Sequence, residues 1–385
     1  MTQLINPITL TQELIQCPSV TPIEGGAISL LEKTLSDLGF CCHRLTFQEE
    51  GTEAVENLYA RLGTTAPNFC FAGHTDVVPI GAKDEWSFDP FSGDLKDGYI
   101  CGRGASDMKG AIAAFIAAVS QFIRHQNLPE NGSISLLITG DEEGPAHNGT
   151  KKVLPWMIEN NEIIDLCLVG EPTNPSQLGE MMKVGRRGSL NGLLTVQGTQ
   201  GHVAYPHLAE NPLPQLIDLL KTLTELKLDQ GSDLFQPSNL EIVSIDVGNT
   251  VSNVIPAQGT AKFNIRFNDH HTGASLEKYL RQSLDKCNGP YQLDISISGE
   301  SFFTSPGELS DLISNAVQKV TGETPELSTS GGTSDARFIT NYCPVVEFGI
   351  VGKTMHKVDE KVTVNELNQL TEIYFHILRQ FFSQK

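Results

Sequence analysis

The chain has 385 residues and a formal net charge of −19, from 46 Asp and Glu against 27 Lys and Arg. This length exceeds that of one typical domain, so we expect two. The excess of acid disfavours nucleic acids and anionic membranes as partners, because their phosphates carry charge of the same sign.

The first part of the chain alternates predicted helices with buried apolar strands. The elements expected here are helices over 7–16 and 26–38, a strand over 68–76, a helix over 109–125, a strand over 133–140, a helix near 153–161 and a strand over 165–172. This alternation predicts an α/β layer with a mostly parallel central sheet flanked by helices. Ligand-binding loops should then lie beyond the carboxyl ends of its strands.

The pattern changes after about residue 184. We expect a strand, a helix, two strands, a helix and a strand, over 189–198, 211–228, 240–248, 260–268, 273–287 and 291–299. This β-α-β-β-α-β order is the ferredoxin-like arrangement. Because α/β patterning resumes at 308–320 and 344–350, we predict a catalytic domain in two segments, 1–184 and 301–385, with an inserted α+β domain over 185–300.

The cysteines and the chain start bear on the cellular compartment. The eight cysteines include no CxxC pair, and most have apolar neighbours, which predicts buried thiols in a reducing compartment. The first residues lack the basic region and long apolar stretch of a signal peptide. No stretch of the sequence approaches the ~18 consecutive apolar residues of a membrane-spanning helix. We therefore expect a cytoplasmic protein.

Polar residues follow the expected buried strands, where each strand ends. His74 and Asp76 end the strand over 68–76, three acids at 141–143 follow the strand over 133–140, and Glu171 follows the next strand. Asp107 precedes a helix, and His356 follows the strand over 344–350 by a short loop. In a parallel sheet these residues gather at one edge.

Two imidazoles and several carboxylates form a ligand set suited to Zn, with Co or Mn as substitutes. A pair of ions needs a carboxylate between them, and Asp107 is the natural bridge because it is short and lies at a helix start. We expect His74 with Glu171 on one ion and His356 with Glu143 on the other. The carboxylate of Asp76 should accept the ring N–H of His74 and fix its tautomer.

The adjacent acids at 142 and 143 cannot do the same work, because neighbouring side chains leave the backbone in different directions. We assign Glu143 to a metal ion and Glu142 to general base, where it would take a proton from water. A solvated acidic turn is the alternative for such a run taken alone.

Eight motifs together resemble a known family. They are HTDVVP at 74, GRGASDMKG at 102, ITGDEEG at 138, VGEPT at 169, GRRGSLNG at 185, GHVAYPHLAENP at 201, GGTSDARF at 331 and TMHKVDE at 354. They resemble the dinuclear zinc aminoacylase and carboxypeptidase group of metallopeptidases, and within it the desuccinylases. The resemblance covers nearly the whole chain and implies the same metal ligands, with Glu142 as acid and base. It also implies a homodimer formed through the inserted domain, which would act as a lid, and His202 reaching across the dimer to stabilise an oxyanion.

An anionic substrate needs basic residues in so acidic a protein. Arg186, Arg187 and Arg266 could provide them, since a guanidinium fork pairs well with a carboxylate, although each could instead be solvated or paired with an acid. By resemblance, further contacts to the substrate are expected from Ser189, Tyr205, Asn253, Gly332 and Thr333.

One stretch departs from the desuccinylases. Where they usually carry an Asn and a small residue before the last His ligand, this chain has Gly352 and Lys353. The metal ligand is kept, while a polar contact to the substrate is lost or replaced by Lys353.

The sequence therefore predicts a dinuclear zinc amidohydrolase that releases succinate from a small, anionic, succinylated amino acid. The alternatives are a related amidase, such as an acetylornithine deacetylase or a dipeptidase, and a non-catalytic binding protein on the same scaffold. Such binding proteins tend to lose the base, whereas Glu142 is present.

Overall fold

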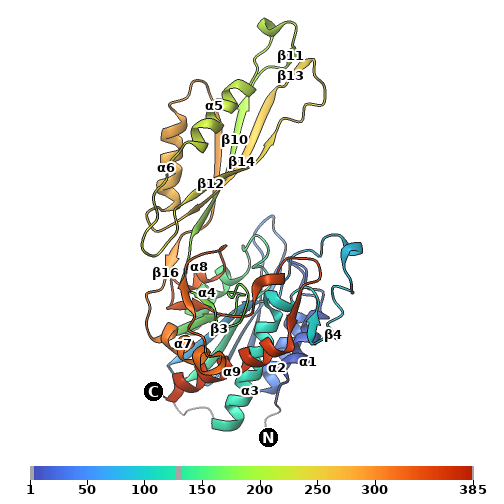
Figure 1. The fold of residues 1–385 in the computed structure, drawn as a ribbon, viewed down its shortest axis with the longest axis vertical. Coiled ribbons are helices and arrows are strands. Elements are labelled where there is room, and N and C mark those ends of the chain that lie inside the picture. The colour runs from blue at the N-terminus through green and yellow to red at the C-terminus, as the bar shows by residue number, and fades with distance from the viewer. Residues whose placement is uncertain (1–3, 127–131, 384–385) are drawn as a thin grey trace. The chain divides into compact units, whose positions relative to one another are not determined.

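The computed structural model describes residues 4–126 and 132–383, and the chain divides into two compact units. Unit 1 comprises the residues up to 184 together with 304–328 and those from 334 onward. Unit 2 comprises residues 185–303 and 329–333. Figure 1 shows both, with the sheet of unit 2 formed by β10, β12 and β14 among others.

Residues 301–303 and 329–333 belong to unit 2, although the sequence boundaries place them in the second catalytic segment. Strand β16 (Phe302–Phe303) pairs with β9 (Gly185–Arg186), which extends unit 2 at that end. The hydroxyl of Thr329 donates to the carbonyl of Leu234 at 2.5 Å. The strand pairing and this side-chain hydrogen bond attach the two short segments to unit 2, and neither contact is evident from hydrophobic patterning.

Unit 1 is built on an eight-stranded mixed sheet. Its four central strands β6, β3, β7 and β18 are mutually parallel, as is the pair β17 and β8, whereas β1, β2 and β6 pair antiparallel and so do β18 and β8. The predicted α/β class is confirmed, with parallel pairing confined to the centre and one edge. In spatial order the strands are β1 (Cys41–Phe47), β2 (Val55–Leu62), β6 (Ser133–Thr139), β3 (Asn68–His74), β7 (Leu166–Val169), β18 (Val345–Glu347), β8 (Met181–Lys183) and β17 (Glu326–Ser328).

Helices cover both faces of this sheet. Helix α3 (Gly110–Gln126) packs on α9 (Val364–Ser383), and both carry aromatic side chains onto Phe69 and Phe71 of β3. Every α3 residue from 111 to 120 is buried, because this part of the helix is apolar on nearly all sides. On the opposite face α4 (Thr150–Glu159) brings Trp156 against Tyr59 of β2. The remaining helices of unit 1 are α1 (Pro7–Ile15), α2 (Ala27–Asp37), α7 (Glu308–Thr321) and α8 (Ala336–Ile339).

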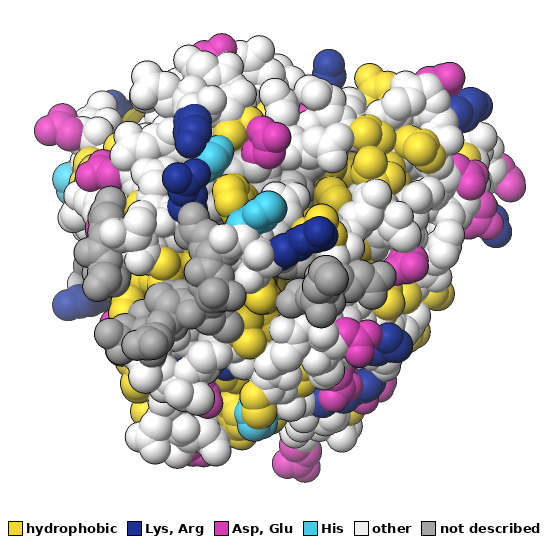
Figure 2. Space-filling model, turned by 90° about the horizontal axis from the view of Figure 1, so that it is seen from below, with side chains coloured by type: hydrophobic (Ala, Val, Ile, Leu, Met, Phe, Trp, Pro, Cys, Tyr) yellow, Lys and Arg dark blue, Asp and Glu magenta, His cyan; other side chains and the backbone are white. Residues whose placement is uncertain are grey.

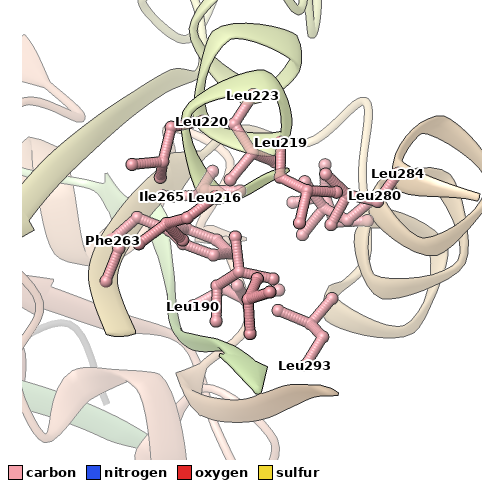
Figure 3. Close-up of a cluster of buried hydrophobic side chains, with 14 of the residues drawn as sticks. Leu190, Leu216, Leu219, Leu220, Leu223, Phe263, Ile265, Leu280, Leu284 and Leu293 are labelled. Atoms are coloured by element: carbon pink, nitrogen blue, oxygen red, sulfur yellow. The ribbon is translucent and has the colours of Figure 1, made fainter. Parts of the chain in front are cut away.

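Unit 2 contains a four-stranded antiparallel sheet in the order β12-β14-β10-β15, which is the ferredoxin-like order for the predicted β-α-β-β-α-β chain path. Leucines of both helices and the inward side chains of the strands form one core, shown in Figure 3. Truncating a fully buried member such as Leu219 to Ala costs ~2–5 kcal/mol. The elements are β10 (Gly188–Gln197), α5 (Leu213–Thr224), β12 (Asn239–Asp246), β14 (Gln258–Phe267), α6 (Gly273–Leu284) and β15 (Gln292–Gly299).

The surface carries charges of both signs. On the face drawn in Figure 2, acidic and basic side chains are both present, with polar surface and apolar side chains between them. Within the part of the chain that the structure describes, no helix has the length and apolar character needed to cross a membrane.

Candidate metal centre

The predicted ligands meet at one edge of the unit 1 sheet because β6, β3, β7 and β18 run parallel side by side. His74 is the last residue of β3, the acids at 141–143 follow β6, Glu171 follows β7, and His356 lies on the loop after β18. Two groups of possible metal ligands result, and each keeps its ligand atoms within 4.8 Å of one another. They are His74, Asp107 and Glu171 in the first group, and Asp107, Glu143 and His356 in the second.

The first group is buried. His74 Nε2 lies 3.3 Å from Asp107 Oδ1 and 3.6 Å from Glu171 Oε1. Two of its three ligands follow adjacent strands, since Ala72 and Val169 are register partners of β3 and β7. The sheet itself therefore fixes the spacing between His74 and Glu171.

The second group joins two loop residues, Glu143 and His356, to Asp107 of the short helical segment η2 (Ala105–Lys109). His356 Nε2 lies 2.8 Å from Glu143 Oε1 and 3.2 Å from Asp107 Oδ2. Asp107 thus directs one carboxylate oxygen to each imidazole, which is the arrangement of a bridging ligand. His356 has φ +60, a left-handed conformation that a non-glycine residue keeps only where its surroundings hold it.

Two buried atoms of this cluster make no hydrogen bond with any described residue. They are Nε2 of His74 and Oδ1 of Asp107, which face each other. A buried acceptor without a donor costs ~1–3 kcal/mol, so such pairs persist where another group satisfies them. A cation between the two atoms satisfies both, and imidazole nitrogen with carboxylate oxygen is a donor set that suits zinc.

The electrostatics of the cluster favour positive charge. Burial opposes the charged form of His74, but Asp107 and the negative charge of Glu171 outweigh it and hold its pKa well above the ordinary value. Asp107 and Glu143 raise the pKa of the exposed His356 to about 10. Burial alone would raise the pKa of Asp107, yet the two imidazoles hold it below its usual range. Three carboxylates around two imidazoles leave an excess of negative charge that a divalent ion can neutralise.

Asp76 acts differently from the expectation. The Nδ1 of His74 lies 2.9 Å from the backbone carbonyl of Asp76, while the Asp76 carboxylate is 3.6 Å away. The ring N–H therefore donates to that carbonyl, which still leaves Nε2 free for a metal. The carboxylate instead accepts from the backbone N–H groups of Glu142 at 3.2 Å and Glu143 at 3.0 Å. Burial raises the pKa of Asp76 to about 6, although His74 and these two amides oppose the shift.

The three consecutive acids have three different environments. The Asp141 carboxylate is buried and accepts from the N–H groups of Ala146 and Asn148, so it shapes the loop. Glu143 contacts His356. Glu142 is half-buried, and loss of hydration with the nearby charge of Glu171 raises its pKa well above the ordinary value.

Two glycines with close neighbours precede Asp107 in the chain. A Cβ on Gly102 would lie 2.4 Å from Ile15 and 2.9 Å from the Pro90 carbonyl, and Gly104 has φ +86. Neither position tolerates a side chain without displacing its neighbours.

Two buried charged residues behind Asp107 were not predicted. The Glu360 carboxylate accepts from the N–H groups of Ser106 at 2.9 Å and Asp107 at 3.1 Å, and from Arg103 Nη1 at 2.7 Å. Both charged side chains are almost fully buried. The sequence feature that could have revealed this ion pair is the presence of Arg103 in GRGASD and Glu360 in HKVDE. Both stretches already contained predicted metal ligands.

Candidate substrate residues of unit 2 form one group near the start of β10. Ser189 is in register with Arg266 of β14, and its hydroxyl accepts from Asn264 at 3.2 Å. The buried Arg186 donates to the carbonyl of Ser330, next to Gly332 and Thr333. Arg187 donates to the Pro237 carbonyl and to Asn239 Oδ1, so part of its fork is already used within unit 2.

A second group lies on the two-stranded ribbon of β11 (Gly201–His202) and β13 (Val254–Ile255). His202, Tyr205 and Asn253 are exposed there, and the ring centroids of His202 and Tyr205 are 5.7 Å apart. The backbone N–H of Ala204 donates to His202 Nδ1 at 3.0 Å. Because Nδ1 accepts, the neutral ring carries its proton on Nε2, ready to donate.

This fold and this cluster agree with the family to which the chain belongs, peptidase family M20/M25/M40, whose match covers residues 70–380. Among its curated relatives, a protein from Rhodospirillum centenum is 61% identical over 98% of both chains, and one from Parvibaculum lavamentivorans is 58% identical over 98% of this chain and 96% of the relative. Both relatives are named succinyl-diaminopimelate desuccinylase.

Solved structures of other family members share the fold. An M20 family metallo-carboxypeptidase from Sulfolobus solfataricus superposes with a TM-score of 0.83 at 18% identity, covering 97% of this chain and 98% of the other. A dinuclear metal binding peptidase of the M20 family from Bacillus subtilis gives a TM-score of 0.68 at 14% identity, with 98% of each chain covered.

Proposed function

We propose that this protein hydrolyses the amide of N-succinyl-L,L-2,6-diaminopimelate to succinate and L,L-diaminopimelate, a step in lysine and cell-wall precursor biosynthesis. The observation that carries the proposal is a shared carboxylate between two imidazoles, beside a glutamate of raised pKa, in a chain 61% identical to a succinyl-diaminopimelate desuccinylase. We place the reaction in the cytoplasm, where the eight free cysteines would remain reduced.

His74, Asp107 and Glu171 would hold one zinc ion, and Asp107, Glu143 and His356 the other, with Co or Mn as substitutes. The fit rests on the donor set and on the two buried atoms without hydrogen bonds. When bound, such ions supply Lewis acidity, which polarises an amide carbonyl and makes a neighbouring water more acidic.

Glu142 is the proposed acid and base. Its carboxylate takes a proton from the attacking water and delivers it to the departing amine, a role that requires a pKa near the working pH. Asp76 positions this group, because its carboxylate binds the backbone N–H groups of both Glu142 and Glu143. The buried turn around Asp141 keeps the remainder of the loop in place.

His202 is the proposed oxyanion donor, through the Nε2–H left free by its bond with Ala204. The first substrate group, with Ser189, Arg186, Arg187, Arg266, Gly332 and Thr333, would bind the carboxylates, and Tyr205 and Asn253 would act with His202.

The separation of these two groups supports a homodimer through unit 2. Ser189 is near the start of β10 and His202 lies beyond its end at Gln197. At ~3.4 Å per residue, the strand alone separates them by ~27 Å. One small substrate does not span that distance, so two copies of the chain would each contribute one group. We propose that unit 2 is also the lid that excludes water on closure.

The test compares substrates on the purified protein with zinc supplied. We expect turnover of N-succinyl-L,L-2,6-diaminopimelate to exceed that of acetylornithine and of dipeptides in kcat/KM. Preference for acetylornithine or a dipeptide would identify a related amidase, and binding without turnover of any of them would identify a binding protein. Elemental analysis of the same preparation gives the metal and its stoichiometry.

A further inference from the structure

Two ligand loops converge on one buried carboxylate behind the metal centre. Oε1 of Glu360 accepts from the backbone N–H of Ser106 at 2.9 Å, from the Ser106 hydroxyl at 3.1 Å and from the backbone N–H of Asp107 at 3.1 Å. Glu360 also lies four residues after His356, on the same loop. A single side chain therefore links the segment that carries the shared ligand to the segment that carries His356.

Arg103 completes this link. Its Nη1 donates to Glu360 Oε2 at 2.7 Å and to the carbonyl of Lys357 at 3.0 Å, and its guanidinium lies 5.1 Å from the centroid of the Trp86 ring. The exposed fractions of Arg103 and Glu360 are 2% and 0%. A buried carboxylate is costly unless a cation and hydrogen bonds compensate it, and here both are supplied from within the protein.

The loop that bears His356 needs such support. His356 and Asp359 both have left-handed backbone conformations, with φ +60 and +59. The Asp359 carboxylate accepts from the N–H and hydroxyl of Ser87 at 2.8 and 2.7 Å, and the next residue is Glu360. Strained positions of this kind persist where surrounding contacts determine them.

From these contacts we propose that Glu360, compensated by Arg103, is a positioning residue for the second metal ion. It would orient Asp107 and His356 together without touching either ion or the substrate. The inference rests on the proposed metal site and deepens it. The first ion should depend on Glu360 much less, because His74 ends β3 and Glu171 follows the adjacent strand β7. The two ligands that belong to the second ion alone, Glu143 and His356, both lie on loops.

Stepwise Co²⁺ titration of the metal-free, full-length protein tests the proposal. In Glu360→Gln we expect the second binding step to weaken by ~10–100-fold, the range typical for residues that orient metal ligands, with a smaller change in the first step. The visible absorption of the second-bound Co²⁺ should also change, because this absorption reports ligand geometry. Glu162→Gln is the matched control, since it removes a carboxylate paired with Arg61 at 2.7 Å elsewhere in unit 1 and should leave both steps unchanged.

Thermal unfolding of the metal-free variants separates positioning from general stability. Equal weakening of both steps, or wild-type affinities with only a lower Tm, would overturn the proposal. If Glu360→Gln does not fold, Arg103→Lys is the second variant, because it keeps the charge but removes the guanidinium Nη1 that donates to both Glu360 and the Lys357 carbonyl. It should weaken the second step, and an unchanged second step would overturn the proposal. A wild-type protein that bound no Co²⁺ would instead refute the metal site itself.

Discussion

The two units place their candidate functional residues in opposite ways. In unit 1 the candidate ligands gather at one edge of the main sheet, where the ligand atoms of each group lie within 4.8 Å of one another. Hydrogen bonds from the backbone to Asp76 and Glu360 hold the segments behind them. In unit 2 the candidate residues lie at both ends of β10, and those on the ribbon are exposed. The candidate ligands of unit 1 meet within a single chain, whereas the two groups of unit 2 would be brought together only in the proposed homodimer. On the proposed roles, metal binding and substrate recognition should be separable by mutation.

The largest effect is expected from Glu142→Gln. The amide keeps the size of the side chain but cannot take a proton, so kcat should fall by about 10²–10⁴-fold, the usual contribution of general acid–base catalysis. The measurement is steady-state hydrolysis with zinc supplied, together with titration of the metal. KM and the affinities for both ions should change little.

Glu162→Gln provides the control, since its partner Arg61 is outside the cluster. A Glu142→Gln enzyme with wild-type kcat would show that the base is another residue, even if it bound zinc normally.

Metal removal should affect the units unequally. Both tryptophans, Trp86 and Trp156, belong to unit 1, so intrinsic fluorescence follows its unfolding. At a free ion concentration of 100 times Kd, each bound ion contributes about 2.7 kcal/mol to stability. Chelation should therefore abolish hydrolysis and lower the unfolding midpoint reported by fluorescence.

Amide exchange in β12 and β14 is the comparison for unit 2. Chelation should leave it unchanged, because no residue of unit 2 belongs to either ligand group. Faster exchange there after chelation would mean that the two units are not energetically separate.

The sequence was most informative where one physical rule applied to several strands. The ends of parallel strands share an edge, and this rule brought together four candidate ligands from a span of 283 residues, namely His74, Glu143, Glu171 and His356. The sequence could not show whether the backbone carbonyl or the carboxylate of Asp76 faces His74, because both acceptors belong to the same residue. It also missed Glu360, since the surrounding run KVDEK has the composition of a solvated loop.

Strands and helices that lie outside the predicted alternation of strand and helix were also missed. Strands β1 and β2 pair antiparallel at the edge of the sheet, outside the alternation of strand and helix that indicated the fold. Helix α9 carries an apolar stripe that includes Leu367, Leu370 and Ile377, so periodicity would have revealed it. The metal and substrate roles of the residues that converge remain predictions until tested.

A smaller effect is expected in unit 2 from Arg266→Lys. Arg266 is in register with Ser189, and Lys would keep the charge while losing the planar fork that suits a carboxylate. Loss of one charge-assisted hydrogen bond is worth ~1.5–3 kcal/mol, or ~10–150-fold in KM if the substrate is held there. The affinity for both metal ions should not change.

Arg281→Lys is the control, because Arg281 pairs with Glu277 on helix α6. If Arg266→Lys lowered kcat or metal affinity instead of raising KM, the role of Arg266 would not be substrate recognition.

The smallest effect is a pH-dependent loss of stability in Asp229→Asn. The Asp229 carboxylate accepts from the N–H groups of Gly231 at 2.8 Å and Ser238 at 3.1 Å, and from Asn268 Nδ2 at 2.7 Å. Burial alone would raise its pKa, but these donors hold it at about 2. Because the folded pKa is below the unfolded value of ~3.9, the carboxylate stabilises unit 2 fully above pH 4 and loses this contribution as the pH falls toward 2.

The variant should therefore lose ~1–2 kcal/mol at pH 7, and its difference from the wild type should shrink toward pH 3. Amide exchange of β12 and β14, compared between wild type and variant at each pH, measures this. The exposed Asp218 of α5 provides the control, since Asp218→Asn should have no effect at either pH. If Asp229→Asn also shifted the unfolding midpoint reported by tryptophan fluorescence, the carboxylate would contribute to the stability of unit 1 as well. The two units would then not be energetically separate.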